Sequence, residues 1–85
     1  MTNEQVIRKT KIKHIKVTTL SGKIFDGDEA SQNRITKKVL SMEFNGLTTT
    51  VWKLADNTKP EVTIQELREA LALADTEHSR LWMEI

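Results

Sequence analysis

The 85-residue chain contains no cysteine, one proline and three glycines. Without cysteine it can form neither disulfides nor thiolate metal sites, and the redox compartment is not revealed. No apolar run approaches the roughly 20 residues that a membrane-spanning helix needs, and the polar start of the chain lacks the apolar core of a signal peptide. These absences predict a soluble intracellular protein or a part of a larger particle.

The chain also lacks an excess of charge of either sign. It has 13 Lys and Arg and 12 Asp and Glu, for a net charge of +1. This balance provides no global attraction to nucleic acid or to a membrane surface. Aromatic residues are few: two Trp, two Phe and no Tyr. A chain of this length buries roughly 60–65% of its unfolded surface, so the core is thin. We expect its largest members to include Phe25, Phe44, Trp52 and Trp82.

The first half of the chain predicts a hairpin followed by a helix. Apolar and polar residues alternate over residues 15–20, as in a half-buried strand. Ser21-Gly22 supplies a tight turn, and residues 23–25 return. In the helix that follows, Asp26 and Glu29 fit a capping box. The apolar residues Ile35, Val39 and Met42 then recur at helical spacing. Asn45-Gly46 ends the helix.

The second half repeats this order. Residues 47–54 are rich in Thr and Val, as strands are, and Asp56-Asn57 forms the turn. Pro60 marks the returning segment as a sheet edge, because proline cannot donate to a ladder. Thr63 and Glu66 form a second capping box. The core stripe of the last helix is Leu67, Leu71, Ala74, His78 and Leu81, widened by Ala70 and Leu73.

These elements predict one α+β domain with a small, mainly antiparallel sheet of two hairpins. Two helices pack on one face of this sheet, in the order ββαββα, because one helix face alone cannot fill a core. Residues 1–13 are expected to form a basic, loosely ordered N-terminal arm, and residues 14–85 the domain. The repetition is either structural pseudo-symmetry or the ordinary alternation of an α+β fold.

Residues able to carry chemistry are scattered. His78 lies on an apolar helix face, where an imidazole usually packs, and His14 is expected to be exposed. No His spacing suits zinc. The acidic run at residues 26–29 lacks the ligand spacing of a calcium loop, so helix capping explains it. No serine lies in a glycine elbow, and no glycine-rich phosphate loop is present. We predict no catalytic, cofactor-binding or metal-binding residues and no enzyme activity.

Two segments predict contacts with other molecules. The last residues are apolar, so they either fold back onto the core or contact another protein through Trp82, Met83 and Ile85. The N-terminal segment is basic and could neutralise phosphates. It lacks interleaved aromatics, and lysines that protect a sheet edge from pairing explain it equally well. Its possible phosphate contacts are Arg8, Lys9, Lys11, Lys13 and Lys16.

Three segments carry motifs that can be compared with known families: residues 21–34, 48–57 and 62–71. The first contains a Phe-Asp-Gly-Asp-Glu run and a Ser-Gln pair, the second a Trp with Ala-Asp-Asn, and the third Thr-x-x-Glu-Leu. In this sequence they are Phe25-Asp26-Gly27-Asp28-Glu29, Ser31-Gln32, Trp52 with Ala55-Asp56-Asn57, and Thr63-Ile64-Gln65-Glu66-Leu67.

With these motifs, the segment from Val17 to Trp82, about four-fifths of the chain, resembles a small phage and prophage domain of unknown function. That domain is commonly found at the end of tail-fibre-type or other tail-associated proteins. The resemblance implies a component of the virion or of its assembly, in the bacterial cytoplasm or on the particle. It implies no catalytic or binding residues.

The resulting expectation is a non-enzymatic, phage-derived structural or interaction module, tail-associated or acting in tail assembly. Its partners would be other phage proteins or a second copy of the chain. No cofactor, membrane or small-molecule substrate is expected. The alternative is a small nucleic-acid-binding regulator that uses the basic arm.

Overall fold

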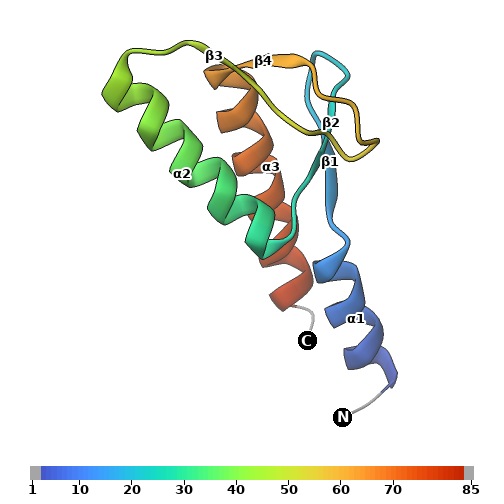
Figure 1. The fold of residues 1–85 in the computed structure, drawn as a ribbon. Coiled ribbons are helices and arrows are strands. Elements are labelled where there is room, and N and C mark those ends of the chain that lie inside the picture. The colour runs from blue at the N-terminus through green and yellow to red at the C-terminus, as the bar shows by residue number, and fades with distance from the viewer. Residues whose placement is uncertain (1–2, 84–85) are drawn as a thin grey trace.

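The computed structural model describes residues 3–83, with the side chains of residues 6, 7 and 10–83. Helices α2 and α3 lie side by side, and the strands cover them on one side (Figure 1). Helix α1 lies beside the C-terminal half of α3. The elements in chain order are α1 (Asn3–Lys13), β1 (Lys16–Thr18), β2 (Ile24–Asp26), α2 (Glu29–Asn45), β3 (Thr49–Val51), β4 (Glu61–Thr63) and α3 (Ile64–Met83).

The α+β class and both antiparallel hairpins are confirmed, but two details of the predicted architecture are wrong. The hairpins form two separate two-stranded sheets, β1–β2 and β3–β4, and not one sheet. They meet where the Ala55 N–H donates to the Ile24 carbonyl at 3.0 Å. Ala55 lies in the connection after β3, so a loop and not a strand reaches β2. The order ββαββα is also incomplete, since α1 precedes β1.

The predicted turns have a clear backbone basis. Gly22 has a φ of 86°, which glycine adopts without the steric cost that a Cβ would bring. Its N–H donates to the Thr19 carbonyl at 2.9 Å and closes the β1–β2 turn. In the β3–β4 connection Asn57 has a φ of 68°. The Asp56 carboxylate accepts bonds from the Thr58 hydroxyl and N–H, which lower the pKa of Asp56.

The helix ends confirm two of the three predicted caps. Gly46 ends α2 in the left-handed conformation, with a φ of 68°. Thr63 and Glu66 form the predicted capping box at α3, with reciprocal bonds of 2.9 and 3.1 Å. The expected box of Asp26 and Glu29 is wrong, because Asp26 is still in β2. Asp28 is the N-cap residue of α2, and its side chain accepts a bond from the Ser31 hydroxyl.

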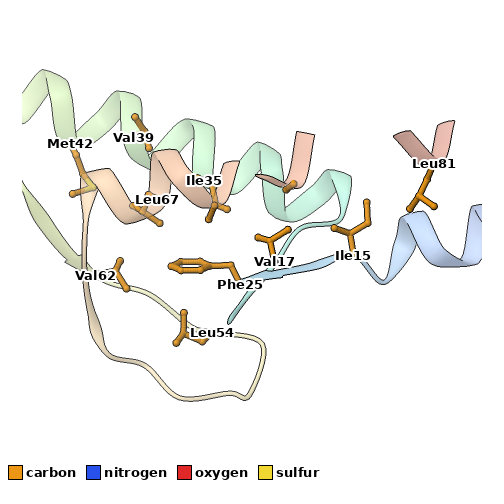
Figure 2. Packing of buried hydrophobic residues seen from close by; sticks show 12 residues of the cluster. Ile15, Val17, Phe25, Ile35, Val39, Met42, Leu54, Val62, Leu67 and Leu81 are labelled. Carbon is orange, nitrogen blue, oxygen red and sulfur yellow. The ribbon is translucent and has the colours of Figure 1, made fainter. Parts of the chain in front are cut away.

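The core lies between the two long helices and the hairpins. The ring of Phe25 occupies its centre, with Leu67 and Ile35 on the helix side and Leu54 on the other (Figure 2). Phe25 is fully buried, and Trp52 packs against the cluster while partly buried. The core prediction is wrong for Phe44, which is 91% exposed, and for Trp82, which is 61% exposed. No described helix is both long and apolar enough to cross a membrane.

Candidate interaction surfaces

The end of α3 presents apolar side chains to solvent. Trp82 is 61% and Met83 84% exposed, whereas the preceding Leu81 is buried against the core. Trp82 also borders a hollow of about 410 Å³ that Ile12 and His78 help to line. Trp82 is therefore only partly covered by the rest of the domain, and most of its surface is open. The predicted contact residue Ile85 lies outside the described residues.

His78 connects α3 to the beginning of α2. Its Nδ1 lies 3.3 Å from the side-chain nitrogen of Gln32, and that nitrogen donates to the Gly27 carbonyl at 2.8 Å. His78 is half-buried, while His14 is exposed. This arrangement fits the structural role that its position on the apolar stripe suggests. Within residues 3–83, no group of three or more His, Asp or Glu is placed to hold a metal ion.

Among the described basic side chains of the N-terminal segment, Lys11 and Lys16 lie apart from Lys13. Lys11 and Lys13 are exposed in the last turn of α1, where positive charge is favourable for the helix dipole. Residues two apart on a helix project about 200° apart. Lys11 and Lys16 line one cavity beside β1, whereas Lys13 lines the separate hollow beside Trp82. The side chains of Arg8 and Lys9 lie outside the described part.

Two carboxylates of α3 hold the β1–β2 turn. Glu66 Oε2 accepts bonds of 2.7 Å from both Lys23 Nζ and the Ser21 hydroxyl. Glu69 Oε2 accepts the Leu20 N–H at 2.8 Å. The Lys23 ammonium, and after it the Ser21 hydroxyl, lower the pKa of Glu66 from its ordinary 4.5 to about 2. Glu66 thus serves both as helix cap and as anchor of the hairpin.

Stability is therefore expected to fall when Glu66 is protonated. A carboxyl whose pKa is lower in the folded state contributes stability that is present above pH 4.5 and is lost as the pH falls towards about 2. We expect a contribution of about 2 kcal/mol, less than the full shift implies, because solvent screens the pair. Urea unfolding across this pH range should show the loss in the natural chain and a much flatter profile in Glu66→Gln.

Glu43→Gln is the matched control for this experiment. Glu43 pairs with Arg68 on the surface, where the two side chains are 46% and 43% exposed, so this pair contributes little. The Glu43→Gln profile should follow that of the natural chain. A Glu66→Gln protein that still lost stability as steeply between pH 4.5 and 2 would show that other groups carry the effect.

The exposed outer face of α2 was not identified in the sequence. Leu40 is 60% exposed and Phe44 91% exposed, and the two are four residues apart, so they share one side of the helix. Leu47, just beyond the end of α2, is 52% exposed. The signal was available, because Phe44 is out of phase with the core positions Val39 and Met42. The C-terminal end of α2 and the C-terminal end of α3 lie at opposite ends of the molecule (Figure 1).

Comparison with known proteins places the chain in a family. A family model described as a domain of unknown function, DUF4376, matches residues 4–81. The match includes α1 as well as both hairpin–helix units. Neither the curated proteins nor the solved structures give a match. Because the match spans nearly the whole sequence, the chain belongs to the DUF4376 family of domains of unknown function.

Proposed function

We propose that this domain is a non-catalytic interaction module of a phage or prophage, associated with the tail or with its assembly. It contacts another phage protein, or a second copy of itself, through the end of α3. The phage context of this proposal comes from the motif resemblance around Phe25 and Trp52. The contact surface comes from the geometry of Trp82 and Met83.

The exposure of Trp82 and Met83 supports the contact more than any other observation. Aromatic residues and methionine are enriched at the centres of protein interfaces and are costly to leave in water. Trp82 also lines the hollow shared with Ile12 and His78, so a partner that covers its ring would meet a recess beside it.

Replacing Trp82 by alanine is expected to weaken association without unfolding the domain. Truncation of a central interface tryptophan typically costs about 2 kcal/mol or more, so affinity should fall by about 30-fold. The measurements are light scattering over a range of protein concentrations, and co-elution with candidate phage tail proteins. Circular dichroism should remain that of the natural chain.

Phe44→Ala is the matched control. It removes an aromatic ring that is even more exposed, at 91%, but lies on α2 far from the end of α3. Association should survive this change. If Trp82→Ala retained the mass and the partners of the natural chain, the end of α3 would not be the contact surface. Unfolding of Trp82→Ala would instead assign Trp82 to the core.

A further inference from the structure

Strand β1 has an open edge. The register pairs Val17 with Phe25 and Thr18 with Ile24. The flanking bonds, from the Gly27 N–H to the Ile15 carbonyl and from the Thr19 N–H to the Lys23 carbonyl, show that odd-numbered residues of β1 bond to β2. The N–H and C=O groups of Lys16 and Thr18 therefore point away from β2. Among the described residues, no strand other than β2 pairs with β1.

The outer edge of β2 confirms this phase of the ladder. Ile24 is the partner of Thr18, and its carbonyl points outward and accepts the Ala55 N–H at 3.0 Å. A loop of the chain thus occupies the outer edge of β2 at this position. The equivalent groups on β1 face a cavity.

That cavity is a groove of about 510 Å³ between β1 and α3. Lys16, Val17 and Thr18 all line it, and three consecutive strand residues share one groove only along a strand edge, because successive side chains alternate between faces. The opposite wall is one side of α3, formed by Leu73, Thr76, Glu77 and Arg80. The groove therefore offers backbone bonding partners along one wall and a helix surface along the other.

The groove is also positively charged. Lys11 and Lys16 line it together with His14 and Arg80, and Glu77 is the acidic residue among the described residues that line it. Glu77 and Arg80 form an ion pair at 2.6 Å within α3, which leaves the charge of Lys11 and Lys16 to dominate. Lysine on an edge strand opposes pairing with a neutral strand. A carboxylate opposite it turns that opposition into attraction.

We propose that the β1 edge and the adjoining face of α3 bind an extended, acidic protein segment, which adds as a strand to the β1–β2 sheet. Backbone bonds to Lys16 and Thr18 hold the segment in register, and its Asp or Glu side chains face Lys11 and Lys16. Its small apolar side chains lie toward Val17 and Leu73. This groove is distinct from the exposed end of α3, so the two proposals fail or stand independently.

A nuclear magnetic resonance titration tests this site. The probe is a short end-capped peptide, Thr-Glu-Val-Glu-Val-Glu-Thr, compared with its neutral counterpart Thr-Gln-Val-Gln-Val-Gln-Thr. At millimolar concentration the acidic peptide should shift the amide signals of Lys16 and Thr18 and slow their hydrogen exchange. The neutral peptide should bind more weakly. Absence of binding, or shifts confined to other residues, would overturn the proposal.

Charge reversal at the strand edge gives the decisive variant. Lys16→Glu should weaken binding of the acidic peptide by about tenfold or more, because a like charge then faces the carboxylates. Lys59→Glu makes the same change at an exposed site in the β3–β4 connection, and should alter the affinity by about twofold at most. Equal affinity in the Lys16→Glu and Lys59→Glu proteins would contradict the proposal.

Two further measurements separate backbone pairing from simple charge attraction. Thr18→Pro removes an outward N–H that the hairpin does not use, so the β1–β2 signals should persist while peptide binding falls. If Thr18→Pro disturbs the hairpin, hydrogen exchange at Thr18 in the natural chain supplies the same answer. A mixed-sequence DNA oligonucleotide that bound the same residues more tightly than the peptide would assign the groove to nucleic acid and overturn the proposal.

Discussion

Replacing Phe25 by alanine is expected to remove most of the protein's stability at room temperature. The ring is fully buried at the centre of the core, where it contacts both layers of the domain. Removing a buried phenylalanine ring typically costs about 3–5 kcal/mol, from lost burial and the cavity left behind. Small domains have a total stability of about 5–15 kcal/mol, and a thin core places this one at the low end. Urea unfolding followed by circular dichroism measures the loss.

Phe44→Ala makes the identical chemical change in the same chain. Because Phe44 is 91% exposed, its removal should change the free energy of unfolding by about 0.5 kcal/mol at most. Comparing the two variants therefore shows whether the loss of stability comes from the burial of the ring and not from its being aromatic. Similar losses in Phe25→Ala and Phe44→Ala would contradict the placement of the core.

Gly27→Ala is expected to have the second largest effect. A Cβ at Gly27 would lie 2.9 Å from both Ala74 Cβ and Ile15 Cγ2, closer than carbon atoms can approach. The Gly27 N–H is also bonded to the Ile15 carbonyl at 2.8 Å, so the backbone cannot easily move away. Overpacking of this kind costs about 1–3 kcal/mol. Thermal unfolding of the two proteins gives the difference.

A double-mutant cycle with Ala74→Gly identifies the cause. Ala74 contributes one of the two clashing atoms, so its removal should relieve part of the cost of Gly27→Ala. The Ile15 contact remains in the double variant, which limits the relief. An equal cost of Gly27→Ala in both backgrounds would show that the contact with α3 is not responsible.

Local signals made much of the fold predictable. Gly22, Asn57 and Gly46 mark their turns and helix end because each takes a positive φ. The Thr63–Glu66 box could be predicted from spacing, since its bonds join residues three apart. Tertiary placement could not be predicted in this way. Whether two hairpins merge into one sheet depends on which segment reaches the β2 edge, and here that segment is a loop.

The features of the candidate surfaces also fall into those that the sequence predicts and those that depend on tertiary packing. The apolar end at Trp82 could be predicted from composition, but the hollow that it shares with Ile12 and His78 depends on how the helices pack. The pairing of Glu66 with Lys23 joins residues 43 apart and leaves no local signal. The run of basic residues could be predicted. That Lys11 and Lys16 line one cavity while Lys13 lines another depends on α1 being a helix.

The indole signals of the two tryptophans test the proposed contact surface most directly. Trp52 is packed against the core and Trp82 is 61% exposed, so their ring N–H resonances report on different environments. When protein concentration is raised or a tail partner is added, the Trp82 signal should shift and that of Trp52 should stay in place. A Trp52 signal that shifts while the Trp82 signal stays unchanged would contradict an interface at the end of α3.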